Sequence, residues 1–197
     1  MIHHAINVPT LLTLTRLLIS SLVLPIFLVY LLPYNFFWLN LSLAFLFVVI
    51  GSTDFFDGYL ARKLQQETSL GKMLDPIADK FLLYATLVSL VVVHKIYFYW
   101  VIILIGREFF VMGLRLIALE NNFSVAVSSF GKLKTSIQLL LLAVLIANPY
   151  QSLGVYGAPY WNYCELSLLA LSIILSLFSA DRYYDFFMRQ FNYMPHR

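Results

Sequence analysis

The sequence predicts an all-α integral membrane protein with six transmembrane helices. Hydrophobic residues make up 61% of the 197 residues and charged residues only 12%, whereas soluble domains are about 45–50% apolar and about 25% charged. Apolar stretches of about 20 residues, the length that spans a bilayer, recur between short polar connections. The six predicted helices occupy residues 9–31, 36–60, 72–94, 98–120, 129–147 and 161–180.

Residues that end helices separate these stretches. Asn7 is expected to cap the first helix, and Pro9 suits its first turn. Pro33 and Asn35 then separate the first helix from the second. Polar or Pro- and Gly-containing segments separate later helices, at residues 63–69, 120–124 and 148–159. Because no internal repeat or linker interrupts this pattern, residues 1–197 are expected to form a single membrane-embedded domain.

The charges indicate topology and exclude two kinds of site. The net charge is +3 without a basic run, which argues against nucleic-acid binding. Positive residues gather around the second and fourth connections and in the C-terminal tail, while the third connection holds only Lys95. By the positive-inside rule, both termini and the charged chemistry face the cytoplasm. Cys164 is the only cysteine, so an intramolecular disulfide and a cysteine-built metal site are excluded.

Four aspartates lie inside or at the edge of apolar helix, two in the second predicted helix and two in the third. A carboxylate there costs at least about 2.5–3.5 kcal/mol and therefore needs a cavity, a partner or a cation. Asp54 and Asp57 are spaced i,i+3, and Asp75 and Asp79 are spaced i,i+4, so each pair lies on one face of its helix. Two antiparallel helices would bring the two pairs together.

Such converging carboxylates would repel one another unless cations lie between them. Oxygen ligands favour hard divalent ions such as Mg²⁺, Mn²⁺ or Ca²⁺ over zinc. Two ions held by bridging carboxylates would suit phosphate-ester chemistry. The alternatives are ion pairs between helices and a cation pathway.

The spacing of this segment is more specific than its charge. It reads Asp54-x2-Asp57-Gly58-x2-Ala61-Arg62-x8-Gly71-x3-Asp75-x3-Asp79. All of these positions match, so the segment resembles the signature of the CDP-alcohol phosphotransferase family. The resemblance implies the fold of that family, a six-helix membrane enzyme, usually a homodimer, that displaces CMP from a CDP-linked substrate.

The resemblance also implies roles for the matching residues. Two divalent ions, Mg²⁺ or Mn²⁺, would be held by Asp54, Asp57, Asp75 and Asp79, and Asp79 would also be the catalytic general base. The CDP moiety would be bound by Asp54, Asp57, Gly58, Ala61, Arg62, Gly71 and Asp75.

Cations in the fourth and fifth predicted helices indicate what kind of acceptor the protein uses. Arg107 and Arg115 lie within apolar sequence, and Lys132 and Lys134 open the next helix. An acceptor that carries its own phosphate would account for all of them, because Arg and Lys are the usual phosphate ligands. Alternatively, Arg107 pairs with Glu108 or with the aspartates, and the lysines mark the cytoplasmic boundary.

Residues 7–16, 107–115 and 124–135 are similar to the bacterial branch of the family that makes phosphatidylglycerophosphate. The resemblance covers residues 6–138 and implies transfer of the phosphatidyl group of CDP-diacylglycerol to glycerol 3-phosphate, with release of CMP, at the bacterial inner membrane. It implies that glycerol 3-phosphate is bound by Arg107, Arg115, Lys132 and Lys134. The role of Arg16, in the site or in an interhelical pair, stays open.

Two alternatives remain at this point. One is a family member with a different acceptor, such as a cardiolipin synthase of this fold. The other is of a different class, a cation-coupled transporter that uses the four aspartates as its ion site. After residue 138 the resemblance is weak, and residues 181–189 are expected to form a solvated or interfacial helix with local charge pairing.

Overall fold

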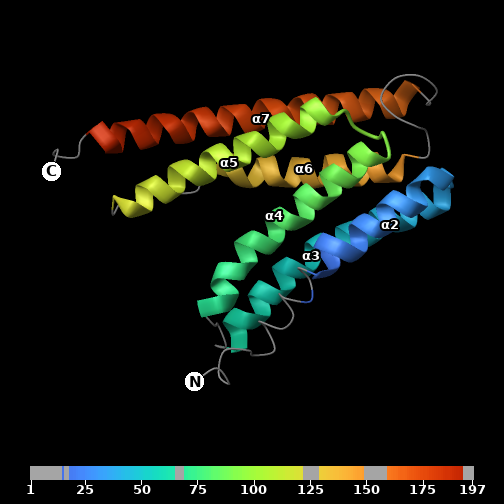
Figure 1. Cartoon of the computed structure of the whole chain (residues 1–197), viewed down its shortest axis with the longest axis horizontal. Helices are drawn as coiled ribbons and strands as arrows, with labels where there is room; N and C mark the ends of the chain where they lie inside the picture. The colour runs from blue at the N-terminus through green and yellow to red at the C-terminus, as the bar shows by residue number, and fades with distance from the viewer. Residues whose placement is uncertain (1–14, 16–17, 65–68, 122–128, 149–158, 193–197) are drawn as a thin grey trace.

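The computed structural model is almost entirely helical in the residues that it describes, which are 15, 18–64, 69–121, 129–148 and 159–192 (Figure 1). Within the helices, the side chains of residues 20–21, 53–79, 119, 129–130, 132, 159 and 191–192 lie outside the description. A π-helical segment, Ile19–Val23, leads into α2 (Leu24–Leu31) and a 3-10 turn, Leu32–Tyr34. The longer helices are α3 (Phe37–Leu64), α4 (Ser69–Val92), α5 (Phe98–Glu120), α6 (Ser129–Ala147) and α7 (Pro159–Asn192).

The helix bounds agree with most of those predicted from sequence. The bounds of α5 and α6 match the predicted ones, and those of α4 differ by no more than a few residues. The first turn is confirmed at Asn35, which adopts the left-handed conformation with φ 52° and donates its backbone N–H to the Leu32 carbonyl. Of the predicted first helix, residues 9–14 and 16–17 lie outside the described residues.

The last helix is longer than predicted. The apolar run ends near residue 180, but α7 continues to Asn192 as an amphipathic helix. Asp181, Asp185 and Arg189 are exposed on it, while Tyr183 and Phe187, spaced i,i+4, are buried against α5. The expected helix at residues 181–189 is thus confirmed as an extension of α7 that packs on its neighbour.

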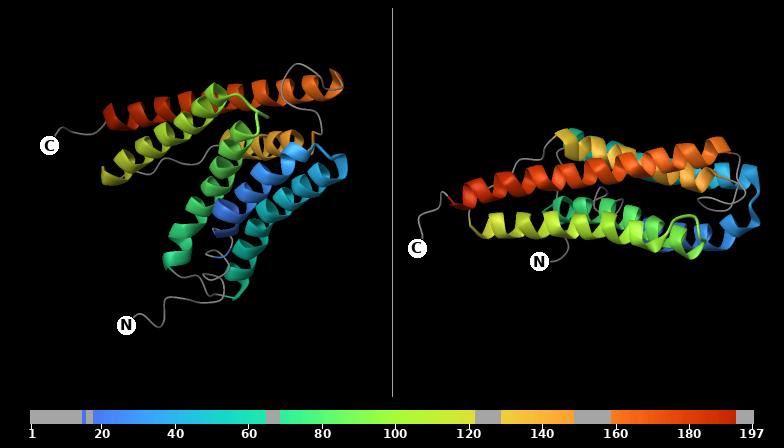
Figure 2. Two further views of the ribbon diagram at one scale, coloured as in Figure 1. Left: turned by 45° about the vertical axis from the view of Figure 1, so that its right-hand side comes forward. Right: turned by 90° about the horizontal axis from the view of Figure 1, so that it is seen from above.

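The helices form two groups that join at one end and diverge at the other. In Figure 1, α2 and α3 run alongside α4 in the lower group, and α5, α6 and α7 make up the upper group. The two groups are tied together by contacts of α3 with α6 and of α4 with α5. Figure 2 shows the same separation from two further directions. The divergence leaves the N-terminal half of α4 on one side and the C-terminal halves of α5 and α7 on the other.

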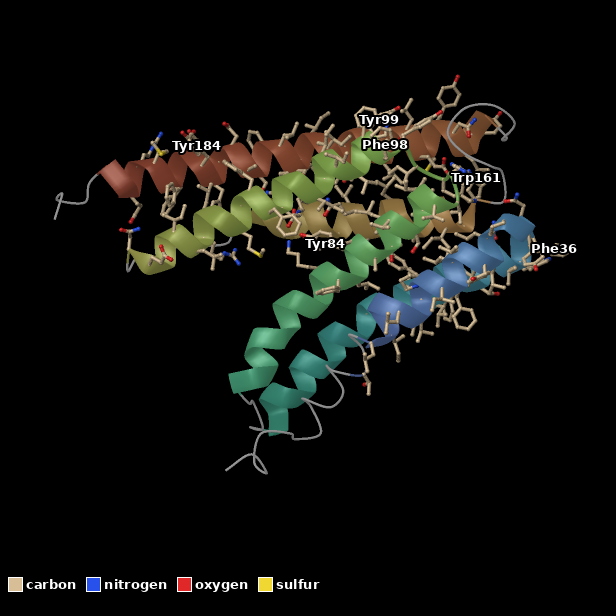
Figure 3. All side chains as sticks on the ribbon, in the orientation of Figure 1. Phe36, Tyr84, Phe98, Tyr99, Trp161 and Tyr184 are labelled. Carbon is tan, nitrogen blue, oxygen red and sulfur yellow. The ribbon has the colours of Figure 1, made fainter. Side chains whose placement is uncertain are left out.

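A leucine-rich core fills the joined region. Leu28 of α2, Phe47 of α3, Leu90 of α4 and Ile146 of α6 are each completely buried. Their burial removes a large apolar area from the surroundings and aligns the four helices. Large apolar side chains also cover the outside, as Figure 3 shows with every described side chain drawn.

The count of six transmembrane helices is not established by helix length and composition. Among the described residues, one segment, Tyr160–Gln190, is long and apolar enough to cross a membrane. Leu24–Tyr34, Phe37–Ser52, Lys80–Val92 and Leu133–Ala147 are apolar but shorter than a full span.

A buried polar cluster of Asn40, Lys95, Asn148 and Glu165 joins α3, α6 and α7 to the α4–α5 connection. Each of the four is at most 2% exposed. The side-chain amide of Asn40 donates to the Asn148 carbonyl at 3.0 Å, and the Lys95 ammonium donates to the same oxygen. The side-chain amide of Asn148 donates to Glu165 Oε1 at 2.6 Å. The lysine that the sequence places in the third connection is therefore buried.

The end of α4 delivers Lys95 to this cluster. His94 has φ 57° and donates its backbone N–H to the Val91 carbonyl at 3.0 Å, and the Lys95 N–H bonds the Leu90 carbonyl at 2.8 Å. This pair of bonds is the Schellman arrangement, which ends a helix through one left-handed residue. Lys95 is therefore buried in the protein rather than exposed to solvent.

Stability is expected to depend on pH through Lys95. Burial lowers the pKa of Lys95 from 10.5 to about 8, although the charge of Glu165 opposes the shift. The folded protein then binds fewer protons than the unfolded chain between these two values, so stability rises with pH across that window. The slope from this one group is at most about 1.4 kcal/mol per pH unit.

The check is thermal stability in detergent from pH 7 to pH 10 for the wild type and for Lys95→Met. Above about pH 8, the stability of the wild type relative to the variant is expected to rise with pH. A difference that stays constant over this range would contradict a lowered pKa at Lys95.

Candidate functional site

A cavity of about 480 Å³ opens where the two helix groups diverge. It is lined by residues of α4, α5, α6 and α7, so no single helix could form it. Five charged side chains line it: Lys80, Arg107, Glu108, Arg115 and Lys134. Among the described lining residues, four cations thus face one carboxylate, which gives the cavity a formal excess of three positive charges and makes it suited to an anion.

Glu108 of α5 is the centre of the charged group. Its Oε1 accepts from Arg107 Nη1 at 2.6 Å and also from the Lys134 ammonium, while its Oε2 accepts from the Lys80 ammonium. The three ion pairs connect α4, α5 and α6. A buried carboxylate with partners on both oxygens satisfies the requirement that buried charges be paired.

Arg107 links the same group to α7. Its Nε donates to the backbone carbonyl of Ser176 at 2.7 Å, while its Nη1 holds Glu108. The rigid fork of a guanidinium group makes both contacts possible at once. Arg107 is thereby committed to bonds within the protein and is 9% exposed.

The cations differ in their access to the cavity. The side chains of Arg107, Glu108 and Lys134 are 7%, 6% and 4% exposed, whereas that of Lys80 is 39% exposed. Arg115, two turns after Glu108 on α5, is also exposed. Lys80 and Arg115 therefore present their charge to a ligand, and the other three groups lie beneath them.

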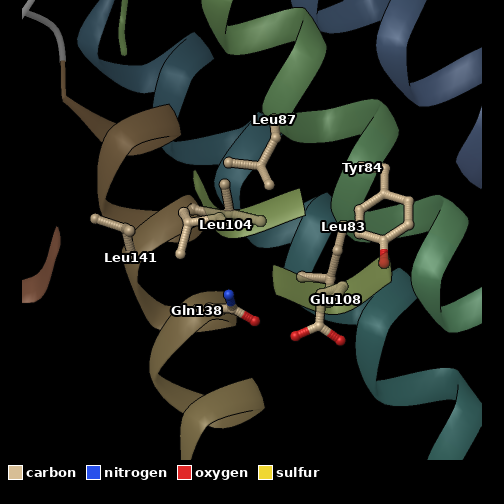
Figure 4. Close-up of a pocket in the computed structure, with 8 residues that line it drawn as sticks. Leu83, Tyr84, Leu87, Leu104, Glu108, Gln138 and Leu141 are labelled. Atoms are coloured by element: carbon tan, nitrogen blue, oxygen red, sulfur yellow. The ribbon is translucent and has the colours of Figure 1, made fainter. Parts of the chain in front are cut away.

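Apolar and aromatic residues close the region around Glu108. Leu87, Leu104 and Leu141 lie together on one side of it, and its carboxylate points away from them (Figure 4). The rings of Tyr84 and Phe109 stack at the cavity wall with centroids 5.9 Å apart. These contacts exclude water from one side of the ion pairs and strengthen them.

The eight residues of the aspartate-containing segment fall on two adjacent helices. Asp54, Asp57, Gly58, Ala61 and Arg62 belong to α3, and Gly71, Asp75 and Asp79 belong to α4, but their side chains lie outside the described residues. The two helices are in contact, and Figure 1 shows the end of α3 beside the start of α4. Within the described part of the chain, no group of three or more His, Cys, Asp or Glu that could hold a metal is found.

The predicted acceptor residues are partly brought together. Arg107, Arg115 and Lys134 line one cavity, and the pairing of Arg107 with Glu108, considered from the sequence, is confirmed. Lys132 lies in α6, but its side chain is outside the description. Arg16 also lies outside the described residues.

Sequence reasoning missed three groups that line the cavity. Lys80 follows Asp79 directly, and its ammonium group within apolar helix was a signal that could have identified it. Ser179 and Tyr183 come from α7, where the sequence offered no motif. The buried Tyr183 hydroxyl has no hydrogen-bond partner among the described residues.

Comparison with known proteins adds to this geometry. A family model described as CDP-alcohol phosphatidyltransferase matches residues 6–178. The chain is 37% identical over 186 residues to proteins from Escherichia coli strain K12 and Shigella sonnei strain Ss046, covering 90% of this chain and 92% of each relative. A protein of Shigella flexneri serotype 5b shows the same identity and coverage. Each relative is named CDP-diacylglycerol–glycerol-3-phosphate 3-phosphatidyltransferase.

Proposed function

Because the chain belongs to the CDP-alcohol phosphatidyltransferase family, we propose that it transfers the phosphatidyl group of CDP-diacylglycerol to glycerol 3-phosphate. The products are phosphatidylglycerophosphate and CMP. The names of the relatives supply the two substrates. The observation that carries the proposal for this chain is the cavity with an excess of three positive charges at the junction of α4, α5, α6 and α7.

The charge of the cavity suits an acceptor that carries its own phosphate. A phosphate monoester bears a charge of about −1.5 to −2 at neutral pH and offers three strong acceptor oxygens. Arg107 and Arg115 of α5 and Lys134 of α6 supply positive charge to the cavity, and we assign Lys132 to the same group. Glu108 balances only one positive charge of the cavity, so an uncharged acceptor would leave the remaining excess without a counter-ion, which is costly away from bulk water.

The family is generally dependent on divalent metal ions, and the residues of α3 and α4 fit such ions. Four carboxylates are hard oxygen donors, the set that Mg²⁺ and Mn²⁺ prefer. In our proposal two ions are held by Asp54, Asp57, Asp75 and Asp79. When bound, they neutralise the diphosphate and stabilise the leaving CMP.

The protein residues position the substrates and move one proton. Gly58, Ala61, Arg62 and Gly71, with Asp54, Asp57 and Asp75, bind the CDP moiety. The oxygen of the acceptor hydroxyl attacks the phosphorus that carries the lipid and displaces CMP. The carboxylate of Asp79 accepts the proton of that hydroxyl. Since a carboxylate is a weak base, this role depends on proximity to the hydroxyl more than on a matched pKa.

The exterior and the charge distribution support a bacterial inner-membrane location. Apolar side chains such as Phe45, Ile102 and Leu166 are more than half exposed, as expected for contact with lipid. In our proposal six helices cross the membrane, the cavity and both termini face the cytoplasm, and the protein is a homodimer. The positive side chains of the cavity support this orientation.

Membership in a transferase family argues against the transporter that the aspartates alone allowed. The acceptor is decided by experiment: purified protein in detergent with CDP-diacylglycerol and Mg²⁺ or Mn²⁺ is expected to release CMP only when glycerol 3-phosphate is present. A chelator is expected to abolish release, and readdition of the metal to restore it. Turnover with phosphatidylglycerol and not with glycerol 3-phosphate would replace our acceptor with that of a cardiolipin synthase.

A further inference from the structure

We propose that Lys80 contacts the phosphate of the acceptor and that Glu108 is the residue that positions it. This inference rests on the proposed function, since it concerns the same cavity and the same acceptor. It adds to the acceptor site one side chain from α4 and one carboxylate whose task is to hold cations. The observation behind it is the ion pair between Lys80 and Glu108 at the boundary between buried and accessible parts of the cavity.

Accessibility separates Lys80 from its neighbours. Its side chain is 39% exposed, whereas that of Lys134, bound to the same carboxylate, is 4% exposed. An ammonium group has three N–H donors, and the contact with Glu108 Oε2 uses one of them. Lys80 can therefore hold Glu108 and a ligand oxygen together, without breaking the ion pair.

Position along α4 places Lys80 beside the reacting end of the acceptor. Asp79, which the proposed function assigns as the base for the acceptor hydroxyl, is the preceding residue of the same helix. Consecutive Cα atoms are only about 3.8 Å apart. Side chains of consecutive helix residues point about 100° apart. The two residues therefore reach a ligand from different directions, and glycerol 3-phosphate carries its hydroxyl and its phosphate on one short molecule.

Glu108 explains how several cations can stay together before the acceptor binds. Lys80, Arg107 and Lys134 all contact this carboxylate, and without it three positive charges would lie next to each other. One negative charge compensates one of the three, and with Arg115 the described lining keeps an excess of three positive charges. That excess suits a phosphate monoester, which carries a charge of about −2. Glu108 acts through Lys80 and is thus a positioning residue.

The test compares the kinetics of Lys80→Met with those of the wild type for both substrates. Removing one charge-assisted hydrogen bond is expected to raise KM for glycerol 3-phosphate roughly 10- to 100-fold. KM for CDP-diacylglycerol is expected to change less than about twofold, because the inference assigns Lys80 to the acceptor. Lys80→Arg keeps the charge and is expected to recover most of the affinity for glycerol 3-phosphate.

Glu108→Gln tests the positioning role. It is expected to raise KM for glycerol 3-phosphate and to change KM for CDP-diacylglycerol less than about twofold. Glu108→Asp is expected to restore part of the affinity for glycerol 3-phosphate. Glu165→Gln is the matched control, because this glutamate is also buried but lies 14 residues before Ser179 on α7, a distance of about 21 Å along the helix. It is expected to leave KM for glycerol 3-phosphate unchanged.

The outcomes separate this inference from the proposed function. Wild-type protein that forms no product with glycerol 3-phosphate overturns the proposed function and the acceptor role of Lys80 with it. Wild-type turnover with an unchanged KM for glycerol 3-phosphate in Lys80→Met overturns the inference alone, as does an equal rise in both KM values. If Lys80→Met has no turnover, thermal stabilisation by glycerol 3-phosphate decides: stabilisation equal to that of the wild type overturns the inference, and its loss supports it.

Discussion

Asp79→Asn is expected to lower the rate of CMP release by about 10³-fold, within the range of 10²–10⁴ for loss of a general acid or base. Asparagine has almost the same shape as aspartate, but it cannot accept the proton of the acceptor hydroxyl and is a weaker ligand for a hard cation. The measurement is CMP release by purified protein in detergent with CDP-diacylglycerol, glycerol 3-phosphate and Mg²⁺ or Mn²⁺. Both substrates are kept saturating so that the rate reports kcat.

Asp185→Asn is the matched control for this change. Asp185 is exposed on the C-terminal part of α7 and is not among the residues that line the cavity. Its replacement is expected to leave the rate within about twofold of the wild type, as surface substitutions usually change little. A rate for Asp79→Asn within about tenfold of the wild type would show that Asp79 is not the general base.

Glu108→Ala is expected to have the largest effect on stability, a loss of about 3–5 kcal/mol, as seen when one partner of a buried ion pair is removed. The change leaves Lys80, Arg107 and Lys134 adjacent without their shared carboxylate. Two of the three, Arg107 and Lys134, are less than 10% exposed, so solvent cannot compensate for the lost carboxylate. The measurement is thermal unfolding in detergent, followed by a probe of helix content.

Two further variants test whether the loss comes from the cations. Glu120→Ala removes an exposed glutamate at the end of the same helix and is expected to change stability by less than about 0.5 kcal/mol. Adding Lys134→Met to Glu108→Ala removes one of the repelling charges and is expected to recover part of the loss. A double variant as unstable as Glu108→Ala would point instead to lost packing around α5.

Much of the fold could be predicted from the sequence because membrane-length apolar runs and helix breakers are local signals. The bounds of α5 and α6 follow from where apolar residues stop, and the turn at Asn35 follows from its tolerance of positive φ. The extent of α7 could not be predicted in this way. Its last turns are amphipathic and are held by the packing of Tyr183 and Phe187 on α5, a contact between segments far apart in sequence.

Part of the candidate site could likewise be predicted from local sequence, and part of it could not. The spacing of Asp54, Asp57, Asp75 and Asp79 within two neighbouring helices is a local pattern, and it predicts both the family and the metal-binding segment. The roles of the cations depend on distant partners. Lys80 and Lys134 meet Glu108 across 28 and 26 residues of chain, and no periodicity in the sequence encodes those pairs.

The sequence by itself therefore determined the helical class, most helix bounds, the family and the residues of the aspartate-containing segment, because each depends on residues within a few turns of one another. Only the tertiary structure decided which cations are accessible. It buries Arg107 and Lys134 with Glu108 and leaves Lys80 and Arg115 facing the cavity. The physical reason is that accessibility and charge pairing are properties of how four helices pack, and side chains far apart in sequence meet only after that packing is complete.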